Sequence, residues 1–203
     1  MLEMSIVLYY NILGENMRKT LLILTSALAV VFTIWFMHFG SLTDNSGALS
    51  VTGIEHPVYF TIWGVLTFGG IYVNLLFAYK KLLPKLQFKY IFFVLSAIGM
   101  ILTLSFDFDY SIYIQYILHC FGSLLFSVST STCVFLLFFL NYKRNKMFLI
   151  FTIIIGFILI ADLILLLIFK ETALIETVPV VFALIILPVL NFTSMFKDKE
   201  YAA

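Results

Sequence analysis

The chain has 203 residues, of which 63% are hydrophobic and only 11% are charged, and its mean hydropathy is +1.10. A soluble domain of this size needs far more charge to cover its surface, so the composition predicts an integral membrane protein. The net charge of +1 argues against nucleic-acid binding, which requires a concentrated basic surface.

Six apolar stretches follow a mixed segment, 1–20, which we interpret as cytoplasmic, with an apolar first half suited to the membrane interface. Most of the stretches approach the roughly 20 residues that a bilayer crossing requires. The third is short and the fourth is long, so we expect the fourth to tilt or to project beyond the membrane. The six predicted spans are 21–39, 58–79, 90–106, 112–140, 147–169 and 177–196, and 197–203 form a short tail.

The basic residues predict the orientation of the chain. Eleven of the twelve Lys and Arg residues lie before the first predicted span, in the loops that follow the second and fourth spans, or after the sixth. Only Lys170 lies on the opposite side. The positive-inside rule therefore places both termini in the cytoplasm. We predict an all-α integral membrane protein, a six-transmembrane-helix bundle with N-in/C-in topology, in the plasma membrane of a bacterial cell.

A polar stripe runs along the predicted span 112–140. At 100° per residue, its members fall within one arc of about 120°. A membrane helix with such a stripe faces protein or a cavity on that side and lipid elsewhere. The members are His119, Ser123, Ser127, Thr130 and Ser131.

Asp162 lies well inside the predicted span 147–169. An acidic side chain at the membrane centre costs roughly 2.5 to 3.5 kcal/mol, so it should face inward and have a partner. Asp162 and His119 lie at matched depths, about 10 Å below the outer boundary, and the loop between their helices is short. The sequence thus permits a catalytic pair of His119 and Asp162. The alternative is that Ser, Thr or backbone groups satisfy each one separately.

Two further outer residues are candidates for binding. Asp44 lies in the turn-rich loop 40–57, and Thr61 lies near the outer end of span 58–79. Thr61 is also a candidate nucleophile for His119. We prefer the alternative, in which its hydroxyl bonds back to its own helix.

The three histidines all fall on or near the outer side, but no two of them share a metal-ligand spacing. We therefore predict no metal site, and we expect no cofactor. On span 58–79, a row of small residues predicts a helix-packing seam with Asn74 hydrogen-bonding across it. This row consists of Thr67, Gly70, Asn74 and Ala78.

The run HCFGSLLF, from His119 to Phe126, resembles the H-x-x-G-A/S-x-x-F signature of a six-helix superfamily, the DRAM, Sfk and Frag-like proteins and a prokaryotic family similar to them. Residues 41–47 resemble its outer-loop S-D-x-G motif, and Gly99 and Phe106 resemble the Gly and Phe before the histidine helix. Residues 55–57 with Phe60 resemble its P-E motif, although here Glu precedes Pro and the loop motif is longer.

The resemblance covers the first four predicted spans. It implies an N-in six-helix bundle with the Asp44 loop and His119 on the lumenal or extracellular side. Some eukaryotic members of this superfamily are linked to lipid-anchor remodelling. The Thr/His membrane hydrolases of the androgen-induced type are similar only at Thr61 and His119.

We predict an outward-facing polar pocket under loop 40–57 that binds or modifies a lipid or lipid-linked group, with Asp44, Thr61, Ser123 and Ser127 as binding residues. Membrane lipid is the expected partner, and a second copy or another membrane subunit is a further candidate. Two alternatives remain open: a small-solute transport component and a structural or immunity-type protein without a site. Whether the chain is an enzyme is left undecided.

Overall fold

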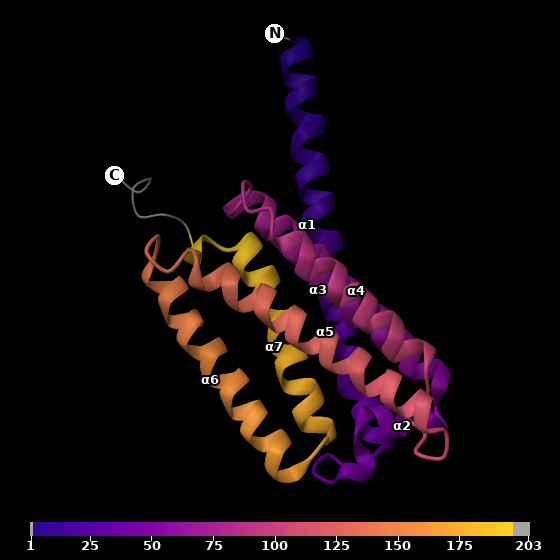
Figure 1. Ribbon diagram of the computed structural model, residues 1–203. Helices are drawn as coiled ribbons and strands as arrows, with labels where there is room; N and C mark the ends of the chain where they lie inside the picture. Colours follow the sequence, from indigo (N-terminus) through magenta and orange to yellow (C-terminus); the bar gives the residue numbers. More distant parts are fainter. Residues whose placement is uncertain (1, 197–203) are drawn as a thin grey trace.

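The computed structural model describes residues 2–196, and within this range the chain is helical and contains no strand (Figure 1). The long helices pack into a bundle with short connections. They are α1 (Leu2–Phe36), α3 (Pro57–Leu82), α4 (Lys89–Ser105), α5 (Tyr113–Phe139), α6 (Lys146–Phe169) and α7 (Ala173–Phe192). A short helix, α2 (Leu49–Glu55), and three 3-10 turns, η1 (Met37–Phe39), η2 (Asn45–Gly47) and η3 (Ser194–Phe196), complete the fold. The predicted tail, 197–203, lies outside the described residues.

Five helices are long and apolar enough to cross a membrane: Lys19–Phe39, α3, α5, α6 and α7. The sixth apolar helix, α4, has 17 residues and is therefore about 26 Å long, slightly less than a bilayer core of about 30 Å. The predicted all-helical membrane class is thus consistent with the structure, and each predicted span overlaps one of the helices.

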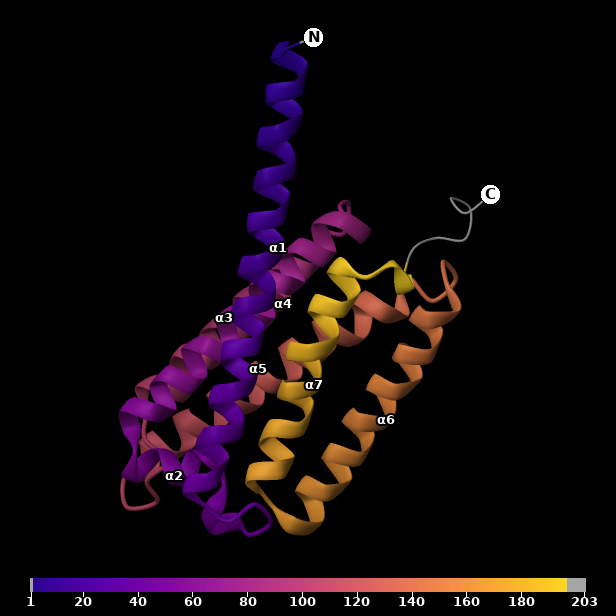
Figure 2. The same cartoon turned by 180° about the vertical axis from the view of Figure 1, so that it is seen from behind.

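Two stretches outside the predicted spans are more helical than expected. The segment before residue 20 is helical from Leu2 and continuous with the first candidate span, Lys19–Phe39, and this first half of α1 extends beyond the bundle (Figures 1 and 2). The loop 40–57 is not entirely irregular, since it contains η2 and α2. Pro57 then begins α3 at a position where its missing N–H group leaves no bond unmade.

The closest helix contact joins α4 and α5, and two glycines make it possible. A Cβ atom on Gly122 would lie 2.7 Å from the backbone nitrogen of Thr103, and one on Gly99 would lie 2.8 Å from the carbonyl oxygen of Gly122. Both distances are too short for any side chain, so the two backbones touch directly. This contact fixes α5 against α4 and sets which face of α5 points toward the other helices.

The seam predicted around Asn74 is confirmed. The Asn74 amide on α3 donates hydrogen bonds to the Ser26 hydroxyl and the Leu22 carbonyl of α1, at 3.1 and 3.2 Å. Its side-chain oxygen accepts a bond of 3.1 Å from the Asn191 amide of α7. Three helices are thereby joined at one buried point, where each bond contributes about 1 kcal/mol.

Helix α6 lies at the edge of the bundle (Figures 1 and 2). Its buried residues, Phe148, Thr152 and Ile155, all fall in the half that follows the short turn from α5. Much of the remaining surface of α6, including Phe157 and Leu167, is exposed. Its second half therefore packs less closely on the bundle than its first.

Candidate functional site

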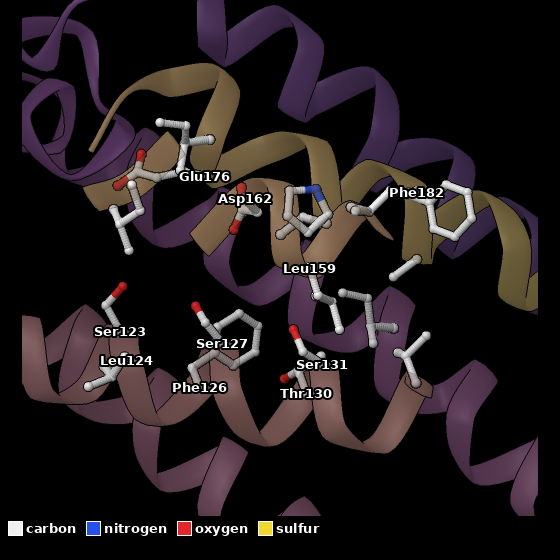
Figure 3. Close-up of a pocket in the computed structure, with 18 of the residues that line it drawn as sticks. Ser123, Leu124, Phe126, Ser127, Thr130, Ser131, Leu159, Asp162, Glu176 and Phe182 are labelled. Carbon is white, nitrogen blue, oxygen red and sulfur yellow. The ribbon is translucent and has the colours of Figure 1, made fainter. Parts of the chain in front are cut away.

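A cavity lies between α5, α6 and α7 (Figure 3), and Ile71 of α3 also lines it. Its volume is about 180 Å³. An apolar cavity of about 150 Å³ accommodates a molecule of the size of benzene, so this one is large enough for a small head group or a short stretch of hydrocarbon. Leu124, which lies on its rim, is 60% exposed, so the cavity opens on the surface of the bundle.

The α5 wall of the cavity carries a row of hydroxyl groups. Ser123, Ser127 and Ser131 recur every four residues and so share one face of the helix. Figure 3 shows all three hydroxyls directed toward the opposite wall, which carries Asp162 and Glu176. Ser123 and Ser127, which the sequence predicts as binding residues, therefore lie at a cavity.

Thr130 also lines the cavity, but its hydroxyl is already engaged. It makes hydrogen bonds of 2.7 Å with Ser96 of α4 and 3.3 Å with the Tyr72 hydroxyl of α3. Thr130 therefore holds the back of the cavity together, and the three serines offer their hydroxyls to its interior.

The opposite walls contribute three carboxylates, those of Asp162 on α6, Glu176 on α7 and Glu171 in the turn between them. The Glu176 carboxylate accepts hydrogen bonds from the Leu49 N–H group and, at 2.9 Å, from the Ser50 hydroxyl. It thus ties the first turn of α7 to α2. Asp162 makes no hydrogen bond or ion pair with any residue in the range 2–196.

The carboxyl group of Glu171 has an oxygen atom without a hydrogen bond. Its side-chain atom Oε2 is buried and has no hydrogen-bond partner within the described part of the chain. Burial raises the pKa of Glu171, because the charged carboxylate loses its hydration. The cavity therefore contains two carboxyl groups, those of Asp162 and Glu171, whose hydrogen-bonding capacity is not filled.

The carboxyl groups are gathered toward one end of the cavity. They lie toward the α6–α7 turn, the serine hydroxyls run along the α5 wall, and the far end is lined by Val134, Ile155, Phe182 and Ala183. Such a gradient complements a molecule with a polar head and a hydrocarbon part.

A proline interrupts the hydrogen bonding of α7 beside the cavity. Pro179 lies inside α7, and its ring nitrogen has no hydrogen to donate to the carbonyl of Ile175 one turn earlier. Both residues line the cavity.

His119 lines a different and much smaller cavity, with a volume of about 30 Å³, together with Thr61 and Asp107. The imidazole is only 1% exposed, and its Nδ1 lies 2.8 Å from the Phe106 carbonyl oxygen. Because a carbonyl can only accept, Nδ1 carries the hydrogen and Nε2 is an acceptor. Nε2 has no partner among the described residues, and the cavity has room for one water molecule to supply it.

The predicted pairing of His119 with Asp162 is not found in the structure. The two side chains line separate cavities, and no hydrogen bond joins them within residues 2–196. His119 lies at one edge of the 120° polar arc of α5 and Ser131 lies at the other. The His119 edge faces the end of α4, and the Ser131 edge faces α6. His119 and Asp162 therefore do not meet, although they were predicted to lie at the same depth.

Thr61 does share a cavity with His119, but its hydroxyl donates a 2.9 Å hydrogen bond to the Pro57 carbonyl of its own helix. This is the back-bonded arrangement that we preferred from the sequence. The hydroxyl proton is therefore not directed at His119, and the arrangement of a nucleophile with its base is not assembled.

Asp44 lines neither cavity. It is exposed, and its carboxylate accepts a 3.1 Å hydrogen bond from the Ser41 hydroxyl within the same turn. The binding role predicted for Asp44 thus has no support in its position. The loop around it is nevertheless docked, because the Asn45 amide donates a 2.8 Å bond to the Glu171 carbonyl oxygen.

Glu171 and Glu176 were not predicted as site residues, because both fall between the predicted spans 147–169 and 177–196. The predicted start of the last span was residue 177, whereas α7 begins at Ala173. The signal for the earlier start was Thr172, whose hydroxyl accepts a 3.3 Å bond from the Ile175 N–H group as a helix cap.

No protein-family model, no curated protein and no solved structure matches this chain. Within the described residues, no group of three or more His, Cys, Asp and Glu side chains is placed to hold a metal ion. The site is therefore interpreted from its own geometry.

Proposed function

We propose that this protein is a six-span membrane protein that binds an amphiphilic membrane lipid in the cavity between α5, α6 and α7. The observation that carries the proposal is the polarity of this cavity, with carboxyl groups toward one end, serine hydroxyls along the α5 wall, and aliphatic and aromatic side chains at the far end. The opening on the surface of the bundle beside the exposed half of α6 supports entry of the lipid from the bilayer.

The proposed orientation is N-in and C-in, with α4 as the short sixth span. Seven of the twelve Lys and Arg residues lie in the loops after α3 and α5 or on the helix ends next to these loops, and the α6–α7 turn lies at the opposite end of α6. Under the positive-inside rule, the polar end of the cavity then faces the outer leaflet, where lipid head groups lie. The resemblance of 119–126 to the DRAM, Sfk and Frag-like proteins agrees with this topology and remains part of the proposal.

Binding is favoured over chemistry on the lipid. The two ionisable side chains that would act as acid and base, His119 and Asp162, line separate cavities. General acid–base catalysis needs the participating groups within hydrogen-bond reach of one reacting centre. We therefore assign His119 to holding the end of α4 against α5, and Asp162 to the binding cavity.

A tryptophan scan of α6 tests the binding proposal. Leu159→Trp places a large side chain in the cavity, and Ile160→Trp places the same side chain at an exposed neighbouring position, which is 62% exposed. Phospholipid retained by the purified protein is counted by native mass spectrometry, and thermal unfolding confirms that both variants are folded. We expect Leu159→Trp to lose the retained lipid and Ile160→Trp to keep it. Equal retention by the two folded variants would contradict the proposal.

Cysteine labelling from outside the cell tests the orientation. On a background without Cys120 and Cys133, a single cysteine is introduced by Lys170→Cys or Lys85→Cys and treated with a membrane-impermeant maleimide. We expect labelling at position 170 in intact cells and at position 85 only after lysis. The reverse pattern would invert the topology.

A further inference from the structure

We propose that the lipid bound in the α5–α6–α7 cavity carries a cationic nitrogen in its head group, as an amine-bearing phospholipid does. This inference rests on the proposed function and specifies the chemical class of the ligand. It is carried by the identity of the polar groups around the cavity, taken together.

The polar side chains of the lining are carboxyl groups, hydroxyl groups and one thiol. The carboxylates of Asp162, Glu171 and Glu176 accept hydrogen bonds, and the serine hydroxyls can act in either direction. The remaining polar side chains are those of Thr130 and Cys120, and none of the lining residues is Lys, Arg, His, Asn, Gln or Trp. These walls therefore favour a ligand that donates hydrogen bonds over one that only accepts them.

Two of the three carboxyl groups are available to such a ligand. The Glu176 carboxylate already accepts hydrogen bonds from Leu49 and Ser50 of α2. Asp162 has no hydrogen bond or ion pair with residues 2–196, and the buried Oε2 atom of Glu171 has no partner there either. The structure thus leaves unfilled acceptors on the cavity walls, in addition to the empty volume.

Charge gives the same preference. Away from water, a carboxylate attracts a cation and repels an anion over several ångströms, because the surroundings screen the field poorly. The nearest basic residue in the sequence, Lys170, is exposed and does not line the cavity. An ammonium group would supply both the positive charge and the hydrogen-bond donors that the protein itself does not provide at this place.

The test compares three lipids with the same acyl chains in nanodiscs: phosphatidylethanolamine, its N-acetyl derivative and phosphatidylglycerol. N-acetylation removes the charge on the nitrogen and keeps the phosphate and the chains. A charge-assisted hydrogen bond is worth roughly 1.5 to 3 kcal/mol, so we expect phosphatidylethanolamine to be retained roughly ten- to a hundredfold more tightly than either of the other two.

Variants locate the preference. Asp162→Asn and Glu171→Gln keep the shape of each side chain and remove the charge, and we expect the double variant to lose most of the preference for phosphatidylethanolamine. Glu55→Gln removes an exposed carboxylate that lines neither cavity, and we expect it to retain the preference. Thermal unfolding confirms that each variant is folded.

The outcomes separate the two proposals. Equal retention of phosphatidylethanolamine and its N-acetyl derivative would overturn the head-group inference and leave lipid binding intact. Failure to retain any of the three lipids would overturn the proposed function itself. Glycerophosphoethanolamine, which lacks acyl chains, is added as a competitor and is expected not to displace the lipid. Displacement at equal concentration would show that the site takes a water-soluble amine, and it would also overturn the proposed function.

Discussion

Ser127 of α5 and Asp162 of α6 lie on facing walls of one cavity, and no hydrogen bond joins them within residues 2–196 (Figure 3). Ser127 directs its hydroxyl toward the opposite wall, and Asp162 is left with an unfilled carboxyl group in an apolar helix. Side chains that only locked the bundle would be expected to bond across this gap. The space between them is where we propose that the lipid binds.

Asp162→Leu should stabilise the unliganded protein and weaken lipid retention. The substitution removes a carboxyl group that pays a desolvation cost without a partner, so we expect a gain of about 1 to 3 kcal/mol in unfolding free energy. Denaturation of the delipidated protein in detergent measures this gain. The control, Glu55→Leu, changes an exposed residue, and its effect should stay within about 0.5 kcal/mol. Loss of stability in Asp162→Leu would show that Asp162 holds the bundle together.

His119→Ala should lower the stability of the protein and leave lipid retention unchanged. It removes the bond to the Phe106 carbonyl and the ring contacts with Phe60 and Phe108, whose centroids lie 5.9 and 5.3 Å from that of His119. We expect a loss of about 2 kcal/mol in unfolding free energy. Lipid retention by the folded fraction should remain at the wild-type value. Unchanged stability accompanied by loss of lipid would place His119 in the binding site.

Gly122→Ala should destabilise the bundle, because the added Cβ atom would lie 2.7 Å from the backbone nitrogen of Thr103. Forcing α4 and α5 apart costs about 1 to 3 kcal/mol. Gly69→Ala is the matched control, since nothing lies within 4 Å of its added Cβ atom. That variant should be as stable as the wild type, or more stable by about 0.5 to 1 kcal/mol, because alanine favours helix. Equal effects of the two substitutions in denaturation experiments would contradict the close packing of α4 on α5.

Glu171→Gln should stabilise the delipidated protein in a pH-dependent manner. Burial raises the pKa of Glu171 in the folded state above its unfolded value, so ionisation disfavours folding. Below the unfolded pKa both states are protonated and the penalty is absent, and it grows as the pH rises through the folded pKa. We therefore expect the stabilisation by Glu171→Gln to be large at about pH 8 and small at about pH 4.

Asp109→Asn provides the control of opposite sign. Hydrogen bonds from the Ser111 side chain and backbone lower the pKa of Asp109, so its ionised form favours the folded state. This contribution is lost as the pH falls through the lowered pKa. Asp109→Asn should therefore slightly lower the free energy of unfolding at neutral pH. A pH profile of Glu171→Gln with the same sign would contradict the burial of Glu171.

The helices could be predicted from hydropathy because each apolar run is bounded by charged or turn-forming residues. Hydropathy did not show that α1 continues toward the N-terminus, because MLEMSIVLYY is not a sustained apolar run and helix can continue outside a membrane. It also missed the first turn of α7, where a polar Thr172 caps an apolar segment that contains Glu176. At α7 a capping hydrogen bond, and not hydropathy, sets the helix boundary.

The site was predicted in part, for a geometric reason. Ser123, Ser127 and Ser131 share a face at any rotation of α5, so their common cavity follows from helical spacing alone. The pairing of His119 with Asp162 needed the relative rotation of two helices, and the sequence fixes only their depth. That rotation is determined by the contact of Gly99 with Gly122, which turns His119 toward the end of α4.

Photo-crosslinking with a diazirine-bearing phosphatidylethanolamine tests the central claim most directly. The protein is crosslinked in nanodiscs with and without excess unlabelled lipid, and peptide mapping locates the label in each sample. The difference between the two samples is the saturable label. The account predicts that this saturable label lies on the cavity-lining segments 120–134 and 155–166 and is absent from the exposed positions Ile101 and Leu167. Label spread evenly over the exposed faces, with no displaceable part on these segments, would contradict it.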